Sequence, residues 1–144
     1  AIITALELGK RRFFESGIRL KAIQSSVDVF HVFQPIMSDL LHEEFWVLFL
    51  NNANQIIGKQ QLSKGGMTST LVDIRLVFKQ AFEVSAVALI IVHNHPSNKV
   101  TPSHSDIQIT DKIKQAGTTL DIKLLDHLIL AEKAYFSFAD EGIL

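Results

Sequence analysis

The sequence predicts a single α/β domain, in which segments with a helical spacing of apolar residues alternate with apolar segments of strand character. Residues 87–92 are apolar at every position, as expected of a central strand that is covered on both faces. Polar residues begin directly after this strand, where open α/β sheets usually place their sites. The length of 144 residues allows one sizeable core and is short for two independent domains.

Two helices are expected before the first strand. The apolar residues of segment 2–15 fall near one side of a helical projection, and Gly17 is expected to end this first helix. A second, short helix follows Ser25, because Ser25 and Asp28 have the spacing of a capping box. Pro35 is expected to end it.

A strand, a turn and a returning strand come next. Residues 43–50 are rich in aromatic and β-branched residues, and an asparagine-rich turn then leads into a second strand over residues 55–62. Apolar residues recur at helical spacing over residues 69–82, which predicts a helix that packs on the sheet, with Thr68 or Ser69 as its cap.

The second half of the chain continues this alternation. The strand over residues 87–92 precedes a helix that Ser103 can cap and that Gly117 is expected to end. Two closing strands are expected within residues 121–130 and 135–138.

Composition excludes several classes of protein. Lys and Arg number 14 against 15 Asp and Glu, so no general positive field draws the chain onto nucleic acid or an anionic membrane. The longest apolar run is far shorter than the roughly 20 residues that a bilayer span needs. With no cysteine, a transition-metal site must use His, Asp, Glu and water, and we expect a cytoplasmic protein.

His93, His95 and Asp106 form a candidate metal site. A catalytic zinc ion usually takes three protein ligands with nitrogen or oxygen donors and keeps a fourth position for water. Residues two apart in an extended segment point the same way, so the two histidines can converge on one ion. Asp106 lies in the first turn of the helix that Ser103 caps, on its core side.

An acid and a hydroxyl accompany this set. Bound zinc lowers the pKa of its water to about 7, but a peptide leaving group still needs a proton, which a nearby carboxylate usually delivers. Glu43 and Glu44 open the first strand and face opposite sides, so only one can point at the metal, and the pattern does not choose between them. Ser103 has two interpretations, a donor that polarises a substrate carbonyl or a plain helix cap.

The motif residues resemble a known family. His93-Asn94-His95-Pro96-Ser97 and Ser103-His104-Ser105-Asp106 look like the JAMM motif of the MPN+ (JAB) zinc-dependent peptidases and isopeptidases. Within that class, residues 43–144 are similar to the bacterial RadC family. The other segments that carry this resemblance are residues 43–50, Lys64-Gly65, residues 88–97, Thr110 and residues 124–130.

The resemblance implies a fold and roles. The fold is a three-layer α/β/α arrangement with a mixed sheet, similar to the cytidine-deaminase-like MPN domains. One zinc ion per chain is held by His93, His95 and Asp106, with Glu43 as the general acid and base and Ser103 as the polarising donor. Asn98 stands where the family usually has glycine, and asparagine tolerates a left-handed backbone, so the turn is expected to survive.

RadC proteins usually carry a helix-hairpin-helix module, which binds the DNA backbone, ahead of this domain. The resemblance implies that residues 1–20 are the end of such a module and that residues 21–144 are the JAMM/MPN domain. The expected partners are a peptide or protein substrate and, through the missing module, DNA, with no membrane partner.

Three alternative functions would each require other residues or properties. A DNA repair-associated module without peptidase activity is suggested by the RadC resemblance, although the net charge argues against it. A zinc nucleobase deaminase expects His-x-Glu and Pro-Cys-x-x-Cys, neither of which occurs here. An inactive scaffold would lack at least one ligand, whereas every motif position is filled.

The remaining polar residues leave alternatives open. Asp126-His127 either forms a structural hydrogen bond or supports the metal ligands. Lys64-Gly65 either shapes the rim of the site or forms a simple turn. His31, His42 and His104 lack the context of the motif and are expected to be solvated or to face a helix.

Overall fold

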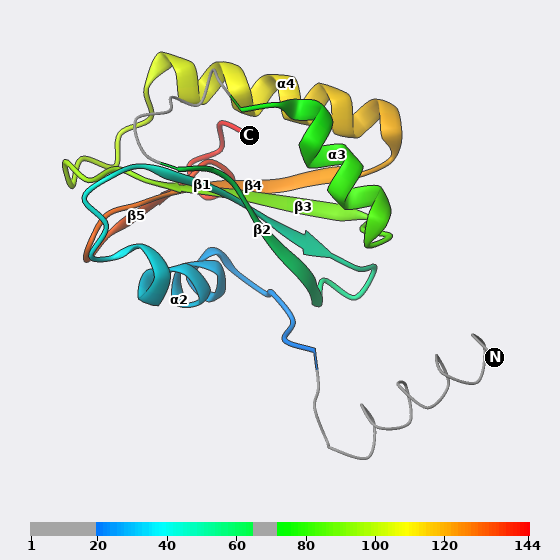
Figure 1. The fold of residues 1–144 in the computed structure, drawn as a ribbon, viewed down its shortest axis with the longest axis horizontal. Helices are drawn as coiled ribbons and strands as arrows, with labels where there is room; N and C mark the ends of the chain where they lie inside the picture. The colour runs from blue at the N-terminus through cyan, green and yellow to red at the C-terminus, as the bar shows by residue number, and fades with distance from the viewer. Residues whose placement is uncertain (1–19, 65–71) are drawn as a thin grey trace.

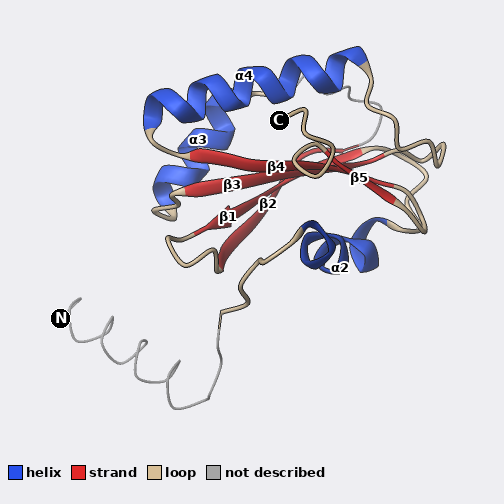
Figure 2. Cartoon of the chain, turned by 180° about the vertical axis from the view of Figure 1, so that it is seen from behind, coloured by secondary structure: helices blue, strands red, loops and turns tan. Residues whose placement is uncertain are grey.

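The computed structural model describes residues 20–64 and 72–144. The elements in this part of the chain are α2 (Ser26–Met37), β1 (Glu44–Leu50), β2 (Ile56–Lys64), α3 (Ile74–Glu83), β3 (Ala88–Asn94), α4 (His104–Leu120), β4 (Lys123–Leu130) and β5 (Tyr135–Ser137). The strands form one sheet in the order β2-β1-β3-β4-β5. Helix α2 covers one face of the sheet, and α3 and α4 cover the other (Figures 1 and 2). The predicted α/β/α fold with a mixed sheet is confirmed.

The sheet topology brings three strand ends to one edge. β3 runs antiparallel to β1 and parallel to β4, with α4 as the crossover between β3 and β4. The carboxyl ends of β3 and β4 therefore lie beside the amino end of β1. In this register, His93 is opposite Phe45 of β1 on one side and Ile129 of β4 on the other.

Alternation along the strands fills two apolar cores. Phe45, Val47 and Phe49 of β1 pack with α3 and α4, whereas Leu48 and Leu50 pack with α2. All seven residues of β3 are buried, as predicted for a strand covered on both faces. Each fully buried Phe, Leu or Ile side chain contributes about 1.5–3 kcal/mol relative to exposure, so both helical layers are held mainly by apolar packing.

The end of α2 and the start of α3 differ from the predictions. Helix α2 continues through Pro35 to Met37, so proline does not end it. Phe33 and Met37 are buried on the sheet, and their packing offsets the backbone hydrogen bond that proline cannot make. Helix α3 begins at Ile74 and is capped by Asp73, so the predicted start at residue 69 is wrong. The suggested caps Thr68 and Ser69 lie outside the described residues.

Gly117 does not end α4, which continues to Leu120. A Cβ atom at Gly117 would overlap the carbonyl oxygen of Ile122, so the glycine allows the start of β4 to pass close to the helix. The helix ends at Asp121, whose backbone is left-handed with φ 57°.

The helix predicted over residues 2–15 and its end at Gly17 lie outside the described residues, as does most of the predicted upstream remnant. Among the helices of residues 20–64 and 72–144, none combines the length and apolar character of a membrane span.

Candidate metal centre

The end of β3 presents His93 and His95 on the same side. His93 is buried in the strand, and its ring stacks on Phe45 with centroids 6.0 Å apart. His95 follows the strand. Its backbone N–H donates to the carbonyl oxygen of Leu130 at 2.8 Å, which continues the pairing of β3 with β4. The extended geometry thus persists to His95. Asn94 points the other way and accepts from the N–H of Glu44 at 2.7 Å.

The first turn of α4 brings Asp106 to the histidines. Ser103 caps the helix by accepting from the Asp106 N–H at 3.1 Å, and the Asp106 carboxylate accepts from the Ser103 N–H at 2.8 Å. This reciprocal capping box fixes the side chain of Asp106, which is buried, over the end of β3.

Three donor atoms converge at this point. Nε2 of His93 lies 3.0 Å from Nε2 of His95. The Asp106 carboxylate lies 3.2 Å from the first ring nitrogen and 3.3 Å from the second. Two ligands of a tetrahedral zinc ion, each about 2.0–2.1 Å from the metal, lie about 3.3 Å apart. The three side chains therefore fit one face of a zinc coordination tetrahedron, and they form a group that could hold a metal ion.

Hydrogen bonds fix the proton on one ring nitrogen of His95 and shift the pKa values of Asp106 and His95. Nδ1 of His95 lies 2.6 Å from the carbonyl oxygen of Lys99, which can only accept, so this nitrogen carries a proton and Nε2 faces the cluster. Burial raises the pKa of Asp106, but hydrogen bonds from His93 and His95 outweigh it and hold the pKa well below its ordinary value. Burial lowers the pKa of His95, and its bonds to Asp106 and Lys99 outweigh this effect and raise it. The carboxylate stays ionised and attracts positive charge to this place.

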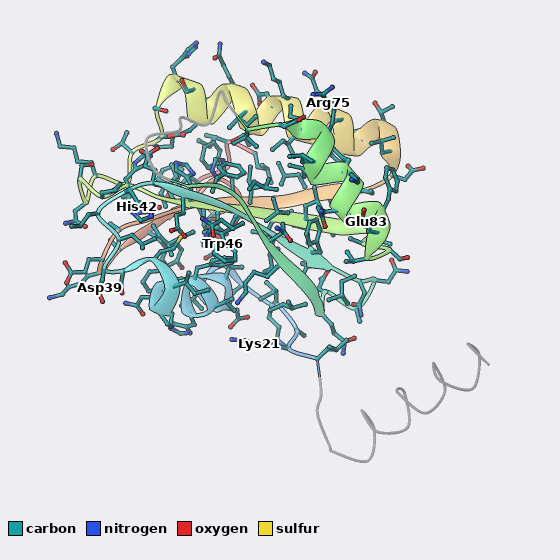
Figure 3. All side chains as sticks on the ribbon, in the orientation of Figure 1. Lys21, Asp39, His42, Trp46, Arg75 and Glu83 are labelled. Atoms are coloured by element: carbon teal, nitrogen blue, oxygen red, sulfur yellow. The ribbon has the colours of Figure 1, made fainter. Side chains whose placement is uncertain are left out.

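The two candidate acids have different surroundings. Glu44 accepts from Trp46 Nε1 at 3.0 Å, and its other oxygen lies 2.8 Å from His42 Nε2. The side chains of these two partners, His42 and Trp46, are labelled in Figure 3. Glu43 precedes β1, is half-buried, and contributes electrostatically to the raised pKa of His95. Glu44 is thus engaged by His42 and Trp46, and the role of Glu43 as the general acid and base stays a prediction.

Ser103 is exposed at the start of α4. Its role as a helix cap is confirmed. Because the hydroxyl oxygen accepts from Asp106, its own proton remains available, and its role as a donor to substrate stays a prediction.

His127 and Thr110 also belong to the centre. His127 of β4 is fully buried, and its ring lies within hydrogen-bond distance of both His93 and Thr110. Burial lowers the pKa of His127 well below its ordinary value, so the ring is neutral. Asp126 faces away and accepts from the N–H groups of His127 and Ala139. Thr110 was not assigned a role from the residues alone, although it lies one helical turn after Asp106.

A cavity of about 260 Å³ borders His95. It lies between residues 37–41, the loop 94–98 and the end of β4. Asn98 in this loop has φ 65° and accepts from the N–H of Glu132 at 3.2 Å, so the expected left-handed turn is present. Of the three candidate ligands, this cavity is lined by His95.

Comparison with known proteins places this centre in a family. A family model described as the RadC-like JAB domain matches residues 23–143. A UPF0758 protein of Flavobacterium johnsoniae is 58% identical over 143 residues, which are 99% of this chain and 62% of that protein. UPF0758 proteins of Porphyromonas gingivalis and Staphylococcus haemolyticus are 42% and 40% identical, over 99% and 96% of this chain and 63% and 60% of their own lengths.

The chain thus spans less than two thirds of the length of these relatives. The resemblance to the RadC family that the motif residues carry is confirmed by the family match, which includes every proposed ligand. The chain belongs to the RadC-like JAB domain family.

Proposed function

We propose that this domain is a zinc-dependent hydrolase that cleaves an amide bond, as a peptidase or an isopeptidase. The observation that carries the proposal is the convergence of two imidazole nitrogens and one carboxylate at 3.0–3.3 Å, with a cavity that borders His95. Nitrogen and oxygen donors without thiolate suit zinc, and three protein ligands leave a fourth position for water.

Glu43 and Ser103 are assigned the proton transfer and the stabilisation of the carbonyl oxygen. A bound zinc ion would lower the pKa of a water molecule and polarise the substrate carbonyl. Glu43 accepts the proton of the attacking water and returns it to the leaving amine, which its position near His95 supports. Ser103 donates its free hydroxyl proton to the carbonyl oxygen, where charge develops.

The proposed substrate is a peptide or protein. The net charge of −1 gives this chain no general attraction for nucleic acid. Any DNA contact of the longer relatives is assigned, as part of the same proposal, to the portion that this chain does not span.

The metal is tested first. Elemental analysis of the protein purified without added metal should find about one zinc ion per chain in the parent and little in His95→Ala. Equal, negligible zinc in both proteins would overturn the proposed site.

The reaction is tested with a matched pair of acids. In a screen of fluorogenic peptides and isopeptide-linked substrates, Glu43→Gln should keep zinc and lose turnover by about 100-fold or more, because general acid–base catalysis contributes about 10²–10⁴-fold. Glu44→Gln is the control, since Glu44 is engaged by His42 and Trp46. A Glu43→Gln protein as active as the parent would show that the proton passes elsewhere.

A further inference from the structure

A chain of hydrogen bonds joins two of the proposed metal ligands through the protein interior. Nδ1 of His93 lies 2.8 Å from Nε2 of His127, and Nδ1 of His127 lies 2.5 Å from Oγ1 of Thr110. The Thr110 hydroxyl lies 2.6 Å from the carbonyl oxygen of Asp106. The chain begins at the ring of one ligand on β3 and ends on the backbone of another on α4, with β4 between them.

The groups at its two ends determine which atom donates in each bond of this hydrogen-bond chain. A carbonyl oxygen can only accept, so the single hydroxyl proton of Thr110 goes to Asp106. The Thr110 oxygen then accepts from Nδ1–H of His127, which leaves a lone pair on Nε2 of that ring. This lone pair accepts from Nδ1–H of His93. Nε2 of His93, which lies 3.0 Å from Nε2 of His95 and 3.2 Å from the Asp106 carboxylate, is then the ring nitrogen left to present a lone pair to a cation.

Packing holds the middle ring in place. The His127 side chain has 0% exposure, and its ring stacks on Phe138 with centroids 4.5 Å apart and an angle of 10°. Phe45 meets the same ring edge-on at 6.2 Å. A ring without access to solvent cannot exchange its partners for water, so Thr110 and His93 alone satisfy its two nitrogens.

We propose that His127 is a positioning residue that, together with Thr110, holds His93 in the tautomer whose Nε2 atom faces the metal. The inference rests on the proposed zinc site and adds to it the residues that prepare one ligand. Metal-binding histidines usually donate their second N–H to a carboxylate, a carbonyl or water. His95 follows this rule through Lys99, whereas His93 uses a second, neutral histidine.

The direction of the hydrogen bonds is tested in the metal-free protein. Nitrogen-15 NMR of the histidine rings, recorded on the whole polypeptide after chelation, distinguishes a nitrogen that carries a proton from one that does not. We expect a proton on Nδ1 of both His93 and His127. A proton on Nε2 of His127 would mean that the chain runs the opposite way, with His93 protonated on the atom that faces the site, and would overturn the proposal.

The effect on the metal is tested with two substitutions of one residue. Thr110→Val keeps the shape of the side chain and removes the hydroxyl, whereas Thr110→Ser keeps the hydroxyl. In a chelator competition, Thr110→Val should bind zinc about 10–100-fold more weakly than the parent, the usual loss for a group that supports a ligand, and Thr110→Ser should recover most of it. If Thr110→Val and Thr110→Ser bound zinc with equal affinity, the Thr110 hydroxyl would not support the metal site.

The role of the His127 ring is tested with a second pair of variants, His127→Gln and His127→Leu. The amide oxygen of His127→Gln can accept from His93, and His127→Leu cannot, so we expect stronger zinc binding by the first in the same competition. Circular dichroism of the metal-free proteins checks that both are folded. If the parent binds zinc and all four variants bind it equally well, the positioning role is wrong and the proposed site stands. If the parent binds no zinc, the proposed function fails, and this inference with it.

Discussion

Nε2 of His93 lies 3.0 Å from Nε2 of His95, and the Asp106 carboxylate bridges the two rings. Two ring nitrogens at this distance repel each other when both present lone pairs, and a cation between them removes the repulsion. The aspartate adds negative charge on the remaining side. The three side chains are thus better satisfied with a cation than without one, so a metal bound here would stabilise the fold.

Metal removal should destabilise the domain. A ligand that binds only the folded state contributes about 2.7 kcal/mol when its free concentration is 100 times its dissociation constant. We expect zinc to raise, and a chelator to lower, the free energy of unfolding of the parent measured with urea. Asp106→Asn should lose this response, whereas Asp111→Asn, an exposed change on the same helix, should keep it. A full zinc response in Asp106→Asn would place the metal elsewhere.

The spacing of the motif predicted that the three candidate ligands would lie together, because both separations along the chain are short. His93 and His95 share one extended segment, and Asp106 lies within a capping box that the sequence also displays. The choice between Glu43 and Glu44 depends on which face of β1 is covered by α3 and α4, and this packing is a long-range property. The contact of His127 with Thr110 joins β4 to α4, so no local pattern reveals it.

The strands were predicted more closely than the ends of the helices, for a related reason. Alternation and apolar runs report on burial, and burial is what forms the sheet. Gly117 was interpreted as a helix stop from its residue type alone. Its actual role is to leave room for the backbone at Ile122, which only the packed structure shows.

Gly117→Ala should therefore be destabilising. The added Cβ meets backbone, which cannot rotate away, and overpacking of this kind costs typically about 1–3 kcal/mol. Gly58→Ala is the matched control, because its nearest neighbour is a side-chain atom of Phe49 at 3.4 Å, an ordinary contact. Urea unfolding of both variants should show a loss for Gly117→Ala alone. Equal stabilities would mean that α4 shifts without cost.

Asp73→Ala should weaken the start of α3. The Asp73 carboxylate accepts from the Arg75 N–H at 3.0 Å, and removing such a cap costs about 0.5–2 kcal/mol. Asp73→Ser offers another capping oxygen and should recover most of the loss in the same unfolding assay. If the serine variant were as unstable as the alanine variant, the ion pair between Asp73 and Arg75 would matter more than the cap.

Asp126 should make the stability of the metal-free protein depend on pH. Burial raises the pKa of this carboxyl above 3.8, and hydrogen bonds from Ser137 and from two backbone N–H groups oppose the shift only in part. Between 3.8 and the folded pKa, the folded state binds more protons than the unfolded state. The contribution of Asp126 to the free energy of unfolding therefore falls as pH rises through this range and is constant above it.

The variant Asp126→Asn isolates this contribution. Its amide oxygen can still accept from the N–H groups of His127 and Ala139, and the Ser137 hydroxyl loses its acceptor, which is a cost that does not vary with pH. We expect the free energy of unfolding of the parent minus that of the variant to decrease from pH 4 upward and then level off. Urea titrations in chelator measure this difference, with Asp111→Asn as a control for the loss of a carboxylate. A difference that grows with pH would show that the hydrogen bonds, and not burial, dominate the pKa of Asp126.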